Sequence, residues 1–152
     1  RAAVRARCWP TVSVVEADAT TWRPPAPVDA VYCAYSLTMI PDWRAAIDNA
    51  HAMLRPGGLF GAVDFYVSER HPRAGLVRHG ALARAFWPRW FGHAGVHPSP
   101  EHLPLLLDRF TPVVLRERSG PLPWLPGLRV PYYVFVGRRR RGGAAVSAQR
   151  TA

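Results

Sequence analysis

Apolar and polar positions in the middle of the chain follow a strand, helix, strand pattern. Residues 28–34 form an apolar run without helical spacing, which predicts a strand buried on both faces. Residues 36–41 read as a loop, and Asp42 is the predicted N-cap of a helix because its carboxylate can accept an N–H of the first turn. Residues 59–65 predict a second buried strand. Together they predict two parallel strands joined by a crossover helix.

The crossover helix has one apolar face and a defined end. Arg55 suits a helix C-terminus, where a cation is favourable, and Pro56 ends the helix. Gly57 and Gly58 allow the chain to reverse into the second strand. The apolar face is expected to contain Ala46, Ile47, Ala50, Met53 and Leu54.

Shorter elements are predicted on both sides of this central unit. Before it we expect the end of a surface helix at 1–7 and a short buried strand at 12–15. After it we expect a helix within 74–91 that Pro88 breaks or kinks, and then a short helix capped by Ser99 with Pro100 at its first position and Glu101 in its first turn. Strands are predicted at 111–118 and 130–137, with a Pro-rich linker at 120–127 between them.

The order of these elements predicts the fold class. We expect an α/β fold, the second half of a doubly wound, mostly parallel sheet that ends in an antiparallel strand pair and lacks its N-terminal strands. The predicted domain covers 1–138, with a helical substrate-side insertion at 66–110, and a disordered basic tail covers 139–152. Because the chain begins with Arg1 inside a predicted helix, we expect it to be a fragment.

Composition adds a strong positive charge. The 152 residues include 20 basic residues, all of them Arg, against 10 acidic ones, for a formal net charge of +10. A GC-rich genome accounts for such a composition, and attraction to membrane headgroups or nucleic acid is the functional alternative. Cys8 and Cys33 are too few for a disulfide framework, which favours a reduced, cytosolic chain. No apolar run reaches the about 18 residues of a transmembrane helix.

Three segments in this order resemble the class I S-adenosylmethionine-dependent methyltransferases, from their third strand to their end. They are Val15-Glu16-Ala17-Asp18-Ala19, Val28-Asp29-Ala30-Val31 leading into Ser36-Leu37, and Leu54-Arg55-Pro56-Gly57-Gly58. The resemblance implies S-adenosylmethionine as the cofactor. It also implies that Asp18 and Ala19 contact the adenine, and that Tyr35, Ser36 and Leu37 line the methionine end.

A closer likeness is to the N-methyltransferase of betaine-lipid synthesis, which methylates the homoserine amine of a diacylglyceryl lipid to the trimethyl form. It is carried by residues 35–43, 63–67, 86–88 and 129–135. The likeness implies a lipid headgroup as substrate and a cytoplasmic protein, peripheral at the inner face of the membrane. The quinone-biosynthesis methyltransferases share much of the central unit and are the near alternative, as are other small-molecule methyltransferases.

The chain departs from this family in one large respect. The glycine-rich loop after the first strand and the acidic residue ending the second strand are missing, and the Gly57-Gly58 pair is a turn. We therefore expect the fragment alone to bind the cofactor poorly and to be inactive. A non-catalytic, basic interaction fragment is thus an open alternative. A nucleic-acid methyltransferase is less favoured, because an Asn/Asp-Pro-Pro-Tyr motif is absent from the sequence.

Each candidate site residue has a structural alternative. Tyr35 and Asp64 are the candidate catalytic residues at strand ends, where ordinary packing or loop capping would also explain them. Asp18 could equally be a solvated loop acid. His71, His93 and His97 lack metal-ligand spacing, so no metal site is expected. The candidate substrate-binding residues are Trp87, Trp90, His97 and Tyr132.

Overall fold

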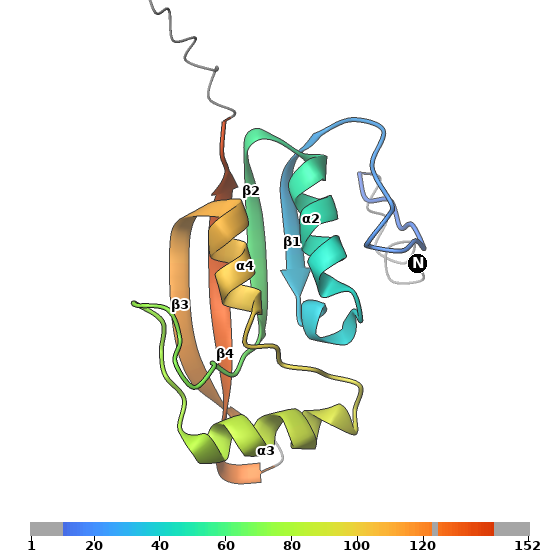
Figure 1. Cartoon of the computed structure of the whole chain (residues 1–152). Helices are drawn as coiled ribbons and strands as arrows, with labels where there is room; N and C mark the ends of the chain where they lie inside the picture. Colours follow the sequence, from blue (N-terminus) through green and yellow to red (C-terminus); the bar gives the residue numbers. More distant parts are fainter. Residues whose placement is uncertain (1–10, 123–124, 142–152) are drawn as a thin grey trace, which may run out of the picture.

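One mixed sheet organises the chain. The computed structural model describes residues 11–122 and 125–141. Its strands lie in the order β1-β2-β4-β3 (Figure 1). β1 (Val28–Ala34) and β2 (Leu54–Phe65) are parallel, and β4 (Leu125–Arg139) runs antiparallel to both β2 and β3 (Phe110–Leu122). The predicted α/β class, with an antiparallel pair at the edge of the sheet, is confirmed.

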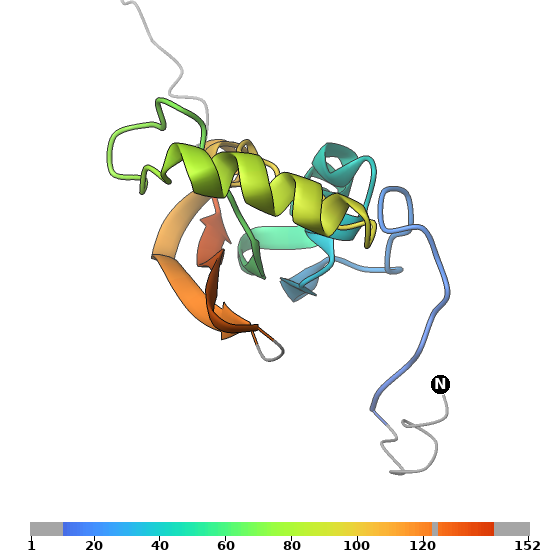
Figure 2. The same ribbon diagram turned by 90° about the horizontal axis from the view of Figure 1, so that it is seen from below.

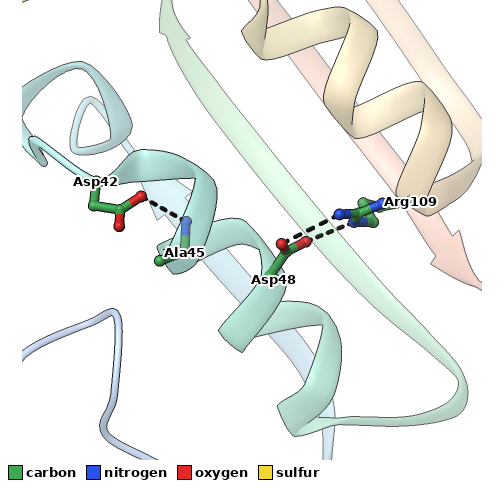
Figure 3. Close-up of polar contacts among 4 residues, drawn as sticks. All are labelled: Asp42, Ala45, Asp48 and Arg109. Carbon is green, nitrogen blue, oxygen red and sulfur yellow. Dashed lines mark hydrogen bonds and ion pairs between the residues drawn. The ribbon is translucent and has the colours of Figure 1, made fainter.

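The predicted crossover helix is α2 (Trp43–Met53). The Asp42 carboxylate accepts a hydrogen bond of 3.0 Å from the Ala45 N–H, as predicted for the N-cap (Figure 3). Ala46, Ile47 and Ala50 are buried on the predicted apolar face. Leu54 is also buried, but it begins β2 instead of ending the helix, so β2 starts five residues earlier than predicted.

Two helices cover one face of the sheet. α2 and α4 (His102–Arg109) lie together on this face, and both contribute to the main core (Figure 1). An ion pair joins them, because both Asp48 carboxylate oxygens accept hydrogen bonds from Arg109, at 2.5 and 3.2 Å (Figure 3). The fully buried side chains of this core include Ile47, Leu54, Phe60, Leu103, Leu106, Phe110 and Phe135.

The opposite face of the sheet is open. No helix of the described part of the chain lies on that side (Figure 2). Tyr32 of β1 is therefore 68% exposed and lies over Gly61 of β2, whose glycine leaves room for the ring. The prediction that β1 is buried on both faces was wrong, because helices cover one face only.

The predicted strand at 12–15 does not form. This segment has no regular secondary structure and is exposed, with Val15 at 56%. A strand needs a neighbouring strand to accept and donate its backbone hydrogen bonds. The apolar run has no neighbouring strand among residues 11–122 and 125–141. Its β propensity alone therefore does not make it a strand.

α3 (Ala81–Gly92) begins later than the predicted start at 74 and continues through Pro88. Gly75 has a φ of +88°, which is not helical, and Ser68 and His79 exchange two hydrogen bonds that hold the preceding loop. The helix survives Pro88 because Trp87 and the neighbouring turn are packed in a second core cluster. α3 lies across the end of the sheet where β1 and β2 finish (Figures 1 and 2).

The C-terminal strands are longer than predicted. The linker expected at 120–127 was wrong: Gly120 pairs with Val130 and Pro121 with Arg129, so the hairpin continues to its tip. Pro121 is tolerated because β3 is an edge strand, where a missing N–H costs little.

The short helix α4 begins at His102, two residues after the predicted start at Pro100. The Ser99 hydroxyl nevertheless accepts a hydrogen bond from the Glu101 N–H.

The Arg run after residue 137 is partly structural. Arg138 and Arg139 belong to β4 and donate hydrogen bonds to the carbonyls of Gly57 and Ala52, so the predicted tail boundary at 139 falls inside a strand. The predicted helix at 1–7 and residues 142–152 of the predicted tail lie outside the described residues. Among the described helices, none is long and apolar enough to cross a membrane.

Candidate functional site

The carboxyl end of β1 turns sharply at Tyr35. This residue has a φ of +48°, and among the described residues it is the only one other than glycine with a positive φ. Its N–H donates to the Val63 carbonyl of β2 at 2.8 Å, which fixes the turn. Such backbone conformations persist only where the surroundings hold them, and they are common at functional sites.

One cavity of about 350 Å³ lies between α2, β1 and the segment before β1. Three of the predicted cofactor residues line it: Asp18, Ala19 and Ser36. The rest of the lining is mainly apolar and includes Trp22, which the sequence interpretation did not single out. The structure therefore brings together two segments that the sequence separates by 16 residues or more, at one edge of the sheet.

Asp18 is held in a fixed turn. Its Oδ1 accepts hydrogen bonds from the Thr20 N–H at 2.8 Å and from the Thr20 hydroxyl at 2.7 Å. These bonds, the backbone one first, lower the pKa of the Asp18 carboxyl below its usual value. The group is exposed and is a carboxylate at neutral pH, so it can accept further hydrogen bonds.

Asn49 of α2 fixes the turn against the helix. Its side-chain amide donates to the carbonyls of Ala19 at 3.0 Å and Trp22 at 2.8 Å, and its oxygen accepts from Arg23 at 3.0 Å. Asn49 is buried and was missed in the sequence analysis. The signal was present, because a polar residue stood three positions after Ala46 within the apolar face of the helix.

A second cavity, of about 330 Å³, lies beside the same corner on the side of the β3–β4 hairpin. It is lined by Tyr35 and Tyr132, two predicted site residues, together with Phe65. The Tyr35 and Phe65 rings lie 5.2 Å apart, and Phe65 stacks on Phe91 of α3 at 4.7 Å. As predicted from strand alternation, Tyr132 and Tyr133 face opposite sides, and Tyr133 is fully buried.

Two predicted site residues lie in the interior. Leu37 is 1% exposed and packs in the main core, so its side chain does not reach either cavity. Asp64 is fully buried and does not point to a cleft edge. Its carboxylate accepts hydrogen bonds from the Thr38 hydroxyl at 2.7 Å and the Thr38 N–H at 3.2 Å. The short helix η1 (Leu37–Met39) is thereby attached to β2.

The two tryptophans predicted to bind substrate lie in different surroundings. Trp87 is buried against Phe91 in the second core cluster, so its side chain packs in the interior instead of lining a substrate site. Trp90 is 46% exposed and stacks on Phe86 on the outside of α3. The His97 side chain is exposed, and its backbone N–H donates to the Thr38 carbonyl at 2.7 Å. None of the three lines the cavities at Tyr35 and Ser36.

A third cavity, of about 170 Å³, lies on the helix-covered side near the start of α4. Glu69, His71 and Arg73 contribute its polar lining. Arg73 is held by both carboxylate oxygens of Asp108, at 2.7 and 3.1 Å. Within the described ranges, no group of three or more His, Cys, Asp or Glu side chains is arranged to hold a metal ion.

Comparisons with known proteins agree on one fold. The sequence profile of a methyltransferase domain matches residues 1–58. The N-methyltransferase NodS from Bradyrhizobium japonicum WM9, solved with S-adenosyl-L-homocysteine, is 18% identical with a TM-score of 0.62, over 91% of this chain and 60% of NodS. No curated protein matches the sequence.

Two further structures extend the comparison. A Bacillus halodurans C-125 protein, for which methyltransferase activity has been proposed, is 14% identical with a TM-score of 0.68, over 92% of this chain and 77% of that protein. The 1,6-didemethyltoxoflavin-N1-methyltransferase of Burkholderia thailandensis is 24% identical with a TM-score of 0.57, over 91% and 56%. The chain thus spans about three fifths of the length of NodS. It has the α/β fold of these methyltransferases, over part of their length.

Proposed function

We propose that this chain is part of an S-adenosylmethionine-dependent methyltransferase that acts on the amino group of a small molecule. The observation that carries the proposal is the cavity shared by Asp18, Ala19 and Ser36 at the end of β1. These residues come from two of the segments that resemble the methyltransferase family, and the methyltransferase-domain profile covers both segments.

The lining of the 350 Å³ cavity suits an adenosine group. A flat, apolar ring system would pack between Trp22 and the apolar side chains of α2, and its exocyclic amine needs an acceptor. Asp18 supplies a carboxylate at neutral pH, with Thr20 fixing its orientation. Asn49 holds the carbonyl of Ala19, so the turn is already set before a ligand binds.

The second cavity suits the methyl acceptor. Tyr35, Phe65 and Tyr132 give it aromatic walls, and aromatic faces attract substituted ammonium groups by cation–π interaction. The fully methylated amine is the strongest match for such walls, because a quaternary ammonium carries a permanent positive charge. We propose that the acceptor is a lipid headgroup amine, as the resemblance to betaine-lipid synthesis implies.

The chemistry requires alignment more than acid or base groups. S-adenosylmethionine, when bound, supplies a methyl group on a positively charged sulfur, and the amine nitrogen forms a bond to that carbon as the carbon–sulfur bond breaks. The nitrogen must first lose a proton, which water can accept. Positioning of the two reactants can then supply much of the rate.

We propose that Tyr35 contacts the nitrogen that accepts the methyl group. Asp64 is proposed to position the loop that follows Tyr35 and Ser36, without contacting a reactant. Tyr35 lines the aromatic cavity, whereas the next residue, Ser36, lines the adenosine-sized cavity. Asp64 acts through Thr38, because its buried carboxylate holds the loop that follows these two residues. Trp87, Trp90 and His97 have no contact with either cavity and are left out of the proposed site.

Cofactor binding can be tested with labelled S-adenosylmethionine and equilibrium dialysis, with each substitution made in the complete enzyme of which this chain is part. Asp18→Ala should weaken binding about tenfold, because it removes a charged hydrogen-bond acceptor. Asp18→Asn keeps an oxygen for Thr20 but loses the charge, which separates the ligand contact from the turn. Asp29→Asn, an exposed carboxylate paired with Arg55 at the other end of β1, is the matched control. Equal affinity for all three variants and the parent chain would remove Asp18 from the site.

The acceptor class needs a separate experiment. The protein is incubated with the labelled methyl donor and, in parallel, with lipid extract, free small amines or RNA. With the complete enzyme of which this chain is part, label in the lipid fraction is the expected result. Label in free amines alone would support the methyltransferase activity but contradict a lipid as the acceptor. Label in RNA and none in lipid would contradict the proposed function.

A further inference from the structure

The outer face of α3 exposes three large apolar side chains in a row. Leu82, Phe86 and Trp90 are 87%, 39% and 46% exposed. A spacing of four residues places them on one side of the helix, and the Phe86 and Trp90 rings stack at 5.5 Å. We call these three residues the outer stripe. A second row packs on the protein instead, made of Ala83, Trp87 and Phe91. The outer stripe is therefore not needed to hold the helix in place.

The segment around this helix carries charge of one sign. Residues 70–100 contain no Asp or Glu, and five Arg: Arg70, Arg73, Arg78, Arg84 and Arg89. Arg73 is paired with Asp108, but Arg78 is exposed and Arg89 donates to the carbonyl of Ala85 in its own helix. Arg89 lies three residues after Phe86 and therefore beside the outer stripe. The exposed apolar row is thus flanked by cations without acidic neighbours in the segment.

This combination identifies the kind of partner. A helix with a Leu, Phe and Trp row beside Arg residues is typical of helices that lie in the interface of a bilayer, with the apolar row at the headgroup–acyl boundary. Trp is suited to that depth because its ring is apolar and its N–H polar. A second copy of this chain would place Arg residues against Arg residues, which opposes self-association through this face.

We propose that α3 docks the protein on an anionic lipid bilayer, with the outer stripe inserted at the headgroup–acyl boundary and Arg78 and Arg89 at the lipid phosphates. The aromatic cavity lies next to this face, since Phe91 of α3 stacks on Phe65 of the cavity wall. Docking does not depend on the proposed methyl transfer, because it uses neither cavity.

The test is co-sedimentation of the full chain with vesicles, without cofactor. One set of vesicles contains phosphatidylcholine alone, and the other also contains phosphatidylglycerol. The chain should bind the anionic vesicles, and Leu82→Ser/Trp90→Ser should weaken binding about tenfold by removing apolar area from the interface. Val14→Ser/Val113→Ser is the matched control, since both valines are exposed on other parts of the surface and both double variants keep every Arg.

A charge variant provides an independent measurement. Arg89→Gln should lower the affinity for anionic vesicles about fivefold and leave the weak binding to neutral vesicles unchanged. Circular dichroism of each variant checks that the fold is retained. Equal binding by the stripe variant and its control would overturn the proposal, as would the absence of binding to anionic vesicles. A dimer in sedimentation velocity that the stripe variant dissociates would assign the face to a second copy, and RNA binding lost with the stripe would assign it to nucleic acid.

Discussion

His102 should make the protein lose stability in mild acid. The ring is fully buried between Trp43, at a centroid distance of 4.4 Å, and Tyr133, at 6.3 Å. Neither ring nitrogen has a hydrogen-bond partner in the described part of the chain. Burial lowers the pKa of His102 to about 4, and the positive charge of Arg44 adds to this. The imidazole is therefore neutral in the folded protein at neutral pH.

The size of the effect follows from the difference between the two states. The unfolded chain binds a proton near pH 6.5, whereas the folded ring resists it until about pH 4. Above pH 6.5 both states are neutral and the group has no effect. As the pH falls from 6.5 to 4, the unfolded state binds the proton first, so folding stability declines by about 1.4 kcal/mol per pH unit, to a total of about 3 kcal/mol.

The perturbation is His102→Phe, which keeps an aromatic ring against Trp43 but cannot bind a proton. Urea unfolding followed by tryptophan fluorescence gives the unfolding free energy of the parent and the variant at intervals from pH 8 to pH 4.5. The difference between them should grow in favour of the variant below pH 6.5. Acidic groups titrate in both proteins and cancel in this difference.

A matched control separates burial from the loss of a histidine. His93→Phe replaces an exposed ring at the end of α3 and should give a difference that is independent of pH. His102→Leu guards against overpacking by the larger Phe ring. If the difference for both His102 variants stays constant from pH 8 to pH 4.5, the ring is not held neutral by burial and the reasoning is refuted.

Two smaller changes test the contacts that hold the site. Asp42→Ala removes the N-cap of α2 and should lower the unfolding free energy by about 1 kcal/mol, with Asp29→Ala, an exposed acid outside any cap, as control. Thr38→Val removes the hydroxyl that donates to the buried Asp64 and should cost about 2 kcal/mol in urea unfolding. Thr38→Ser keeps that hydroxyl and should recover much of the loss. An unfolding free energy of Thr38→Val equal to that of the parent chain would show that the hydrogen bond does not contribute.

The central unit could be predicted because its signals are local. Asp42 before an apolar face determines where the helix begins, whatever the rest of the molecule does. Pro56 was predicted to end this helix, but α2 already ends at Met53, and Pro56 and the two glycines lie inside β2, where Gly57 has a φ of +83°. The antiparallel pair at the end of the chain was predictable for the same reason. Its two strands are short apolar runs that lie close in sequence.

The errors arose where a partner decides the outcome. Residues 12–15 have strand propensity but no neighbouring strand among the described residues, so they stay exposed. Pro121 read as a linker residue, yet the edge position of β3 makes it compatible with a strand. Asn49 was missed because its role depends on carbonyl groups of a turn 27 to 30 residues earlier in the chain. Such contacts are set by tertiary structure and leave only a weak local pattern.

The corner at Tyr35 shows most directly what the backbone adds to the sequence. The resemblance assigned Tyr35 and Ser36 to one wall of one site. In the structure they line two different cavities on either side of the turn, where Tyr35 has a φ of +48°. A glycine would adopt this turn without strain, whereas a tyrosine there costs about 1 kcal/mol or more. Replacing Tyr35 with glycine would relieve that strain but remove one aromatic wall. A Tyr35→Gly variant with raised stability and weakened amine binding would therefore separate the two roles of this residue.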